Sequence, residues 1–373
     1  MIPLANPKAN YLAYKQEIDQ AINQVLNSGQ YILGENVELF EQEFATYIGS
    51  NYGIGVASGT DALILALRAC EIGNGDKVIT VSHTAVATVA AIELVGAKPI
   101  LIDIEADSYT LDPNVLTDIL KILFKSKSNR PKAIVVVHLY GQPANLPEII
   151  KLAQYYNLYL IEDSAQAHGA SFMGRKLGSW GHLSTFSFYP TKNLSAIGDA
   201  GMIVTNDIKL SEKLKLIRQY GWQTRYVSNV IGTNSRLDEL QAAILRVKLK
   251  YLDIDNQKRR KIAQIYDQGL INTDLILPKP NSDALSVYYQ YVVRTKNRDN
   301  LLFHLHKNNI LASIHFPLPI HLQPAYKNRL ALIKPLPITE KIAKEIISLP
   351  IYPELTKKEV NIVIDQITKA PAN

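Results

Sequence analysis

Short runs rich in valine and isoleucine alternate along this chain with stretches of helical periodicity. Runs that are apolar at every position are typical of strands buried on both faces, which occur in parallel sheets covered by helices. We expect strands at residues 77–81, 99–103, 133–137 and 158–161, and helices at 85–95, 113–124 and 146–156. The chain is therefore predicted to be an α/β protein whose mostly parallel sheet lies between helices.

The length of 373 residues suggests about two domains. We place the boundary near residue 250, which gives a large domain of residues 1–250 and a smaller one of residues 251–373. The large domain begins with a helical segment, because residues 12–28 and 35–48 have apolar side chains at helical spacing. In the smaller domain we expect a strand at 287–294 and helices at 298–308, 338–347 and 356–369.

The net charge of +6 suits an anionic partner, whether nucleic acid, a membrane surface or a phosphorylated small molecule. The basic residues are mostly dispersed, and the densest run, residues 258–261, is expected on a solvated helix face. The sequence has no RNA-binding or zinc-finger signature and no compelling helix-turn-helix, so nucleic-acid binding is not expected.

The single cysteine, Cys70, excludes an intrachain disulfide and fits a reducing compartment. The N-terminus lacks the basic-then-apolar plan of a signal peptide, and the apolar runs are too short to span a bilayer. We therefore expect a cytoplasmic protein with no membrane partner.

Polar residues follow several predicted strands at the point where each strand ends. The ligand site of a parallel sheet lies outside the carboxyl ends of its strands, so we expect these residues to gather at one edge. They are residues 58–60, 83–84, 138–141, 162–169 and Lys192.

Lys192 follows an aromatic run of strand character, residues 186–189, that Pro190 ends. A glycine-containing turn then leads into a strand at 202–205. A lysine flanked by apolar and small residues on such a turn can be desolvated, which frees its amine as a nucleophile for Schiff-base chemistry. Taken alone, Lys192 also fits an ordinary solvent-facing loop residue.

Residues 58–60, Ser-Gly-Thr, lie between a predicted strand and a predicted helix. A helix N-terminus offers unpaired N–H groups and a partial positive charge, Gly59 permits close approach, and the two hydroxyls add donors. The segment therefore predicts a phosphate site, although an ordinary N-cap explains the same residues.

Asp163 comes directly after an apolar strand, where a carboxylate is poorly solvated unless it is paired. A protonated ring nitrogen would be a suitable partner, and the alternatives are a turn cap or a basic side chain. His168, in the same turn, fits either a polar brace or a catalytic group. Further along, Ser235 is expected to cap a long helix that reaches Lys250.

His315 and His321 lie in a segment with three prolines, which must be a rigid loop. No cysteine or cluster of carboxylates completes a metal site around them, so no metal is expected.

Five segments, in this order and spacing, resemble the pyridoxal-phosphate-dependent sugar aminotransferases of the DegT/DnrJ/EryC1/StrS family. The likeness covers nearly the whole chain, from the loop at residues 29–34 to the loop at 315–323. It implies a fold type I aminotransferase with a large α/β domain, a smaller C-terminal α+β domain, and a homodimer whose active sites lie at the interface. The segments that carry it are residues 58–63, 162–166, 186–193, 198–201 and 234–243.

The resemblance implies pyridoxal 5'-phosphate (PLP) as the cofactor, bound covalently by Lys192. Asp163 would pair with the pyridinium nitrogen, and Gln166 would contact the ring hydroxyl side. Many members have an aromatic ring at the position of Ala85 to stack on the cofactor, which leaves His83 as the candidate here. The phosphate-binding residues would be Gly59, Thr60, Ser187 and the partner subunit's Asn234.

The resemblance also implies amino transfer from L-glutamate to a nucleotide-linked keto sugar. The context at residues 315–326 is most similar to enzymes that aminate C3 of a dTDP-linked 3-keto-6-deoxyhexose. Phe316 stands where many members have tyrosine, so a hydroxyl contact to the sugar is not expected there. The candidate sugar or nucleotide contacts are Tyr31, Tyr189, Arg225, His315 and His321.

Three alternatives remain open on this scaffold. The first is amination at C4 of a nucleotide-linked 4-keto sugar. The second is a sugar dehydratase of the same family, which is less expected because those enzymes have histidine in place of the lysine and Lys192 is present. The third is a non-catalytic regulator that senses a small ligand or binds DNA.

Overall fold

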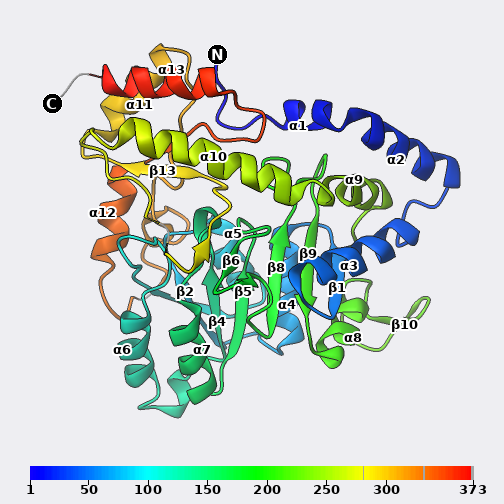
Figure 1. Ribbon diagram of the computed structural model, residues 1–373. Helices are drawn as coiled ribbons and strands as arrows, with labels where there is room; N and C mark the ends of the chain where they lie inside the picture. Colours follow the sequence, from blue (N-terminus) through cyan, green and yellow to red (C-terminus); the bar gives the residue numbers. More distant parts are fainter. Residues whose placement is uncertain (280, 331, 371–373) are drawn as a thin grey trace.

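The computed structural model describes residues 1–279, 281–330 and 332–370. Its centre is a seven-stranded sheet of order β1-β9-β8-β5-β4-β2-β3, in which β9 runs antiparallel to both neighbours and the other pairs are parallel (Figure 1). The predicted α/β class is thus confirmed. The strands of this sheet are β1 (Tyr52–Val56), β2 (Lys77–Val81), β3 (Lys98–Ile102), β4 (Ala133–Val137), β5 (Tyr159–Asp163), β8 (Leu183–Ser187) and β9 (Gly201–Thr205).

Helices cover both faces of the sheet because alternate residues of each strand point to opposite sides. In β4, Ala133 and Val135 pack in a core with α4, α5 and α8, whereas Ile134 and Val136 pack in a core with α6 and α7. Helices α3 and α9 cover Phe186 on this second side. These helices are α3 (Glu35–Ile48), α4 (Gly59–Ala69), α5 (Val86–Leu94), α6 (Pro113–Leu123), α7 (Leu146–Tyr155), α8 (Ile208–Ile217) and α9 (Glu239–Leu249).

A further apolar core lies among the C-terminal elements, and it includes Tyr266, Leu349 and, from the N-terminus, Ile2. In Figure 1, α10 lies between the sheet and α13. The division of the chain at residue 250 stays a prediction. The C-terminal elements are α10 (Leu252–Leu270), β13 (Tyr291–Arg294), α11 (Arg298–Lys307), α12 (Pro337–Glu345), β14 (Ile346–Leu349) and α13 (Lys357–Thr368).

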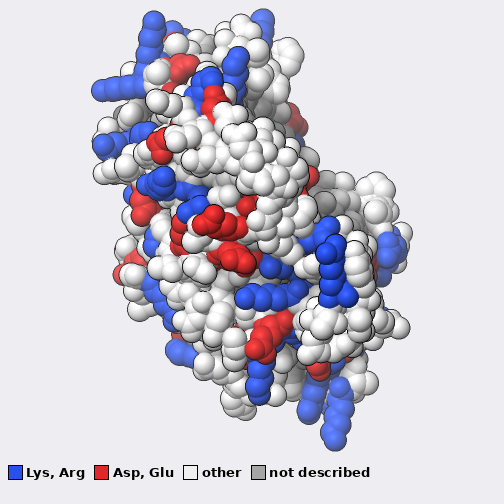
Figure 2. Space-filling model, turned by 90° about the vertical axis from the view of Figure 1, so that its right-hand side faces the viewer, with Lys and Arg blue, Asp and Glu red and all other residues white. Residues whose placement is uncertain are grey.

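The remaining elements are short, apart from α2. Within the described residues, no helix is long and apolar enough to cross a bilayer. On the face shown in Figure 2, basic side chains alternate with acidic ones and do not form one continuous band. These elements are α1 (Pro7–Ala13), α2 (Lys15–Ser28), β6 (Ser171–Phe172), β7 (Arg175–Lys176), β10 (Trp222–Thr224), β11 (Val227–Ser228), β12 (Ala284–Leu285) and the 3₁₀ turns η1 (Lys127–Asn129), η2 (Leu139–Gly141) and η3 (Ile320–Leu322).

Two local expectations differ from the structure. Ser235 does not cap the long helix, because its hydroxyl donates to Asp61 Oδ2 at 2.7 Å, and α9 begins after Asp238 instead. Arg259 is not on a solvated face: it is buried, and its guanidinium donates to the carbonyl of Ile351 at 3.0 Å. In both cases a distant backbone or side chain provides a partner that local sequence does not reveal.

Candidate active site

The carboxyl ends of the parallel strands and the start of β9 meet at one edge of the sheet. Gly201, the first residue of β9, pairs with Val56 at the end of β1 and with Ser187 at the end of β8. Asp163, the last residue of β5, pairs with Thr185 of β8. The turns that follow β1, β5 and β8 therefore open at the same edge.

Lys192 lies on the turn after β8, where its N–H donates to the carbonyl of Tyr189 at 2.8 Å. Its Nζ is 4.4 Å from the ring centroid of Tyr289. Two neighbouring histidines are affected by its charge. Burial first, and the positive charge of Lys192 second, lower the pKa of His168 to about 3 and that of His315 to about 4. Both imidazoles are therefore neutral at pH 7.

Asp163 is buried and accepts a hydrogen bond from Thr88 Oγ1 at 2.8 Å and a longer one from the N–H of Ala165 at 3.3 Å. Burial raises the pKa of the Asp163 carboxyl, although these donors and the charge of Lys192 oppose the shift. A carboxylate with few donors in such a place gains from a cationic partner.

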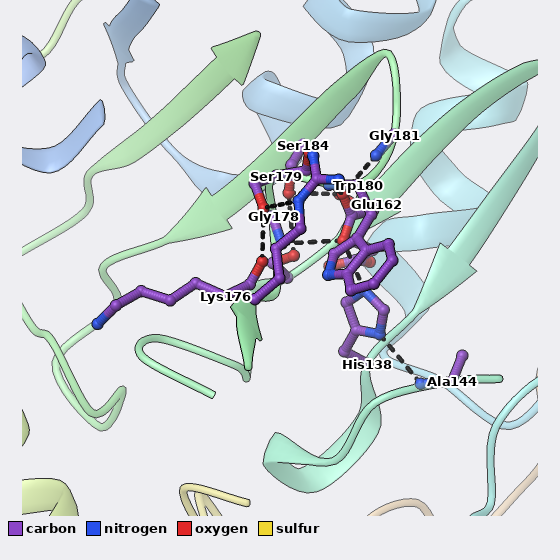
Figure 3. A network of polar contacts seen from close by, with 12 residues as sticks. His138, Ala144, Glu162, Lys176, Gly178, Ser179, Trp180, Gly181 and Ser184 are labelled. Carbon is purple, nitrogen blue, oxygen red and sulfur yellow. Dashed lines mark hydrogen bonds and ion pairs between the residues drawn. The ribbon is translucent and has the colours of Figure 1, made fainter. Parts of the chain in front are cut away.

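Glu162, the preceding residue, lies in a different environment (Figure 3). Its carboxylate accepts from His138 Nε2 at 3.0 Å and from the N–H groups of Gly178, Trp180 and Gly181 at 2.7–2.8 Å. His138 Nδ1 accepts from a backbone N–H, so Nε2 carries the proton. Burial raises the pKa of Glu162, but the hydrogen bonds outweigh it and the pKa is lowered overall.

The η2 turn connects three of the residues chosen from the sequence. The N–H of Tyr140 donates to Gln166 Oε1 at 2.8 Å, and the hydroxyl of Tyr140 donates to the carbonyl of His315. His83 Nε2 hydrogen-bonds to the same hydroxyl at 2.9 Å, and burial lowers the pKa of His83 to about 4. His83 is 1% exposed, with its ring edge-on to those of Tyr109 and Tyr140.

The N-terminus of α4, which follows β1, packs closely against Ser187 at the end of β8. A Cβ atom on Gly59 would lie 2.5 Å from Ser187 Cβ, so only glycine fits there. Ser58 caps the helix by accepting from the N–H of Asp61 at 3.1 Å. The first N–H groups of α4 are thus presented beside Ser187, and the cap and the phosphate site predicted from the sequence are compatible.

Comparison with known proteins decides the family. The family model described as DegT/DnrJ/EryC1/StrS aminotransferase family matches residues 13–368. The chain belongs to this aminotransferase family. A relative from Aneurinibacillus thermoaerophilus, named dTDP-3-amino-3,6-dideoxy-alpha-D-galactopyranose transaminase, is 46% identical over 99% of this chain and 99% of its own.

Two solved structures extend the comparison. DesV of S. venezuelae, in complex with a ketimine intermediate, is 42% identical with a TM-score of 0.94 over 98% of this chain and 97% of its own. NtdA of Bacillus subtilis, with bound cofactor PMP, is 28% identical with a TM-score of 0.88 over 96% of this chain and 82% of its own. The fold is therefore that of an aminotransferase over almost the whole chain.

The donor set of this aminotransferase suits a phosphorylated pyridine cofactor. Lys192 supplies an amine, Asp163 supplies a buried carboxylate for a protonated ring nitrogen, and Gly59 lets Ser187 lie against the N-terminus of α4, whose first N–H groups suit a phosphate. In the described residues, no three His, Cys, Asp or Glu side chains are grouped so that they could hold a metal ion.

Four other residues chosen from the sequence lie at the surface of the aminotransferase. Tyr31 and Tyr189 are about half exposed, at 49% and 52%. Arg225 is exposed on the hairpin between β10 and β11 and stacks on the ring of Tyr226. Asn234 is exposed and lines a pocket with Ala57 and Asp199. Their exposed side chains are available to a ligand or to a second subunit.

The two histidines of the proline-rich loop have separate environments. His315 Nδ1 hydrogen-bonds to Ser348 Oγ at 3.0 Å. His321 is buried, with Nδ1 at 2.7 Å from Ser82 Oγ and Nε2 at 3.3 Å from Glu340. The charge of Lys192 affects His315, so these two residues are near each other. His321 instead attaches the loop to the end of β2 through Ser82.

The sequence assigns no role to Tyr140, Thr88 or Tyr289, although each contacts a residue to which it does assign one. Tyr140 lies within residues 138–141, which the strand-end pattern indicates without giving a role. Tyr289 belongs to the aromatic run that was assigned to a strand at 287–294. The aromatic content of that run is the one sequence feature that draws attention to Tyr289.

Proposed function

We propose that the protein transfers an amino group from L-glutamate to C3 of a dTDP-linked 3-keto-6-deoxyhexose, with PLP as cofactor. The observation that carries this proposal is the convergence of Lys192, Asp163 and the N-terminus of α4 at one sheet edge in a chain of this family. The sugar and the position of amination rest on the 46% identical relative, whose name specifies a dTDP-linked 3-amino-3,6-dideoxy sugar.

PLP would be held by the residues of that edge. Lys192 would bind it covalently, Asp163 would face the ring nitrogen, and Gln166, fixed by the turn at Tyr140, would face the ring hydroxyl side. When bound, the cofactor supplies an electron sink for the carbanion formed when the amino donor loses its α-proton. The phosphate would lie among Gly59, Thr60, Ser187 and the partner subunit's Asn234.

Lys192 is the group placed to carry the proton. Its free amine would move the α-proton of the amino donor to the cofactor carbon and, in the second half-reaction, would move a proton from the cofactor carbon to the sugar carbon that becomes aminated. His168 and His315, with pKa values of about 3 and about 4, stay neutral at pH 7 and so do not compete as acids. Lys192 would therefore carry the proton in place of these two histidines.

The sugar nucleotide would bind above this edge. Tyr189 and His315 are next to Lys192 in the chain or in space, and Tyr31 and Arg225 have exposed side chains that suit contact with a nucleotide or a second subunit. His321, being buried against Ser82, would act by holding the loop of His315. A homodimer with shared active sites and a cytoplasmic location are part of the same proposal.

Two other functions use the same residues differently. Amination at C4 of a nucleotide-linked 4-keto sugar would keep every cofactor residue and change the pose of the sugar. A ligand-sensing regulator would need neither the amine of Lys192 nor the carboxylate of Asp163.

An absorbance titration tests the proposal. The purified protein with PLP should show a lysine-bound pyridoxal band at about 410–430 nm. Glutamate should remove the band, and a dTDP-3-keto-6-deoxyhexose should restore it. Lys192→Ala should give neither the band nor turnover, while Lys176→Ala, which changes a lysine paired with Asp253 away from this turn, should behave as the parent.

The outcomes separate the alternatives. Restoration by a 4-keto sugar alone would establish C4 amination. Absence of the band, or a Lys192→Ala variant with parental turnover, would refute the aminotransferase proposal and leave the regulator. Sedimentation of the holoprotein as a monomer at micromolar concentration would refute the shared active site.

A further inference from the structure

Tyr289 lies with its ring against the amine of Lys192. The distance from Lys192 Nζ to the ring centroid is 4.4 Å, which is within the range of a cation–π interaction. The hydroxyl of Tyr289 lies 3.3 Å from Thr191 Oγ1, in the residue just before the lysine. The ring and the hydroxyl therefore contact the same turn at two points.

The segment that carries Tyr289 is fixed to the rest of the site. The N–H of Val287 and the hydroxyl of Ser286 both donate to the carbonyl of Gly141, at 3.2 and 3.1 Å. Asn193 Nδ2 donates to the carbonyl of Val287 at 3.0 Å, and Arg259 donates to the carbonyl of Tyr288 at 3.4 Å. The ring is thus held from the η2 turn, from the lysine turn and from α10.

The groups around Lys192 differ in how they affect its charged form. The charge of Lys192 lowers the pKa of the Asp163 carboxyl against the larger effect of burial, and His168 and His315 are neutral at pH 7. Arg259 and Glu354 line a small cavity together with Lys192. The Tyr289 ring adds an electron-rich face that stabilises an ammonium ion without adding a charge.

The phenol of Tyr289 responds to the lysine in turn. Burial raises its pKa, but the positive charge of Lys192 and the interactions of the hydroxyl with Thr191, Gln290 and Lys192 outweigh burial and lower the pKa overall. The two side chains are therefore coupled electrostatically, in agreement with their contact distance.

We propose that Tyr289 is a further catalytic residue, whose ring face holds the amine of Lys192 and favours its protonated form between steps. This assignment rests on the proposed function, in which that amine carries the proton. It predicts that the ring face and the hydroxyl both contribute, because the ring lies over Nζ and the hydroxyl also interacts with Lys192.

The test measures Lys192 itself in the apoprotein. The rate of acetylation of Lys192 is followed against pH by peptide mass spectrometry, because only the neutral amine reacts. In Tyr289→Leu the midpoint of this profile should fall by about half to one pH unit, so labelling below the midpoint becomes roughly 3–10-fold faster. Tyr289→Phe keeps the ring but loses the interaction of the hydroxyl with Lys192, so its midpoint should lie between those of the parent and of Tyr289→Leu.

The neighbouring residue gives a matched control. Tyr288 is on the same segment and its ring packs on Tyr291 at 6.1 Å instead of on Lys192. Tyr288→Leu should leave the labelling profile of Lys192 unchanged. In the holoenzyme, Tyr289→Leu should lower kcat about tenfold while KM for the keto sugar stays the same, because the ring contacts the lysine and not the sugar.

Each result is decisive for the assignment. A Tyr289→Leu profile equal to the parent's, or a loss confined to KM, would overturn it. If Tyr289→Leu does not fold, Tyr289→Trp serves instead: its larger ring should move the midpoint upward, and a downward move would overturn the assignment. Labelling needs neither PLP nor substrate, so a shifted profile in a chain that forms no pyridoxal band would refute the proposed function and leave the Lys192–Tyr289 contact standing.

Discussion

Glu162 and Asp163 are adjacent buried carboxylates on β5, but their surroundings shift their pKa values in opposite directions. Glu162 accepts four hydrogen bonds, and its pKa is lowered although burial alone would raise it. Asp163 has one close side-chain donor, Thr88, and burial raises its pKa. Since neighbouring strand residues point to opposite faces, a single step along the chain separates the two environments.

The difference indicates that the Glu162 carboxylate stabilises the fold, whereas the Asp163 carboxylate is available to bind a ligand. The Glu162 network ties β5 to the turn at His138 and to the loop at Gly178–Gly181 using groups of the chain alone. The carboxyl group of Asp163 has few donors, so its ionisation costs free energy unless a cation lies beside it. We expect substitutions at the two positions to affect different measurements.

Replacing Asp163 should give the largest loss of activity. Asp163→Asn removes the charge that would keep a ring nitrogen protonated, and we expect kcat to fall roughly 10²–10³-fold, as for other electrostatic groups of active sites. The free energy of unfolding should stay the same or rise, because a buried charge with few donors is removed. Steady-state kinetics and urea denaturation measure the two effects, and a large loss of stability with normal kcat would reverse the assignment of the two carboxylates.

Replacing Glu162 should give the largest loss of stability. Glu162→Gln breaks a buried pair with His138 and leaves N–H donors facing an amide, and we expect unfolding to become easier by about 3–5 kcal/mol. The turnover of the folded fraction should change much less. Glu148→Gln is the control: Glu148 pairs with Lys151 at the surface and should contribute about 0–1 kcal/mol.

The pH dependence of stability should differ in sign at the two positions. The pKa of Glu162 is below its ordinary value of 4.5, so its contribution is present above that pH and is lost as the pH falls through the lower folded-state value. The pKa of Asp163 is above its ordinary value of 3.8, so its ionisation costs stability at neutral pH and the cost disappears in acid. Urea denaturation from pH 7 downward should show the defect of Glu162→Gln and the gain of Asp163→Asn both shrinking; parallel curves would contradict this account.

The smallest effect should come from Thr88. Thr88→Val keeps the shape and removes the 2.8 Å hydrogen bond to Asp163, which should raise the pKa of that carboxyl further and lower kcat by roughly 3–10-fold, about 1 kcal/mol. Thr80→Val is a matched control, because Thr80 is equally buried but donates to the carbonyl of Val135. Equal effects of the two substitutions would mean that Thr88 acts through packing alone.

Features that depend on the local sequence pattern, such as strand positions and strand ends, can be predicted from the sequence. Strands at residues 77–81 and 133–137 were expected with the bounds that the structure has, and Asp163 and Lys192 were placed at strand ends because apolar runs stop beside them. The partnership of Glu162 with His138 has no local signal, since 24 residues separate them and His138 follows β4 whereas Glu162 lies on β5. Their meeting depends on which strands are neighbours.

The Tyr289 segment shows a second limit. A run of aromatic residues favours a strand, but Tyr288 adopts a positive φ of 43°, which interrupts extended backbone, and β13 starts only at Tyr291. The interruption is stabilised by hydrogen bonds to Gly141, far away in the sequence. Contacts of that kind belong to the tertiary structure, so neither the bend nor the position of Tyr289 over Lys192 could be predicted.

The position of β9 also bears on the kinetics of folding. β9 lies between β1 and β8, and its partner β1 is about 150 residues away in the sequence, so closing this pair carries a large loop-closure entropy. Until β9 is inserted, the turn after β1 and the turn that carries Lys192 have no common strand to hold them together. Under the proposed function, PLP binding during refolding should therefore require β9 to be inserted in the sheet and should appear after the helices have formed.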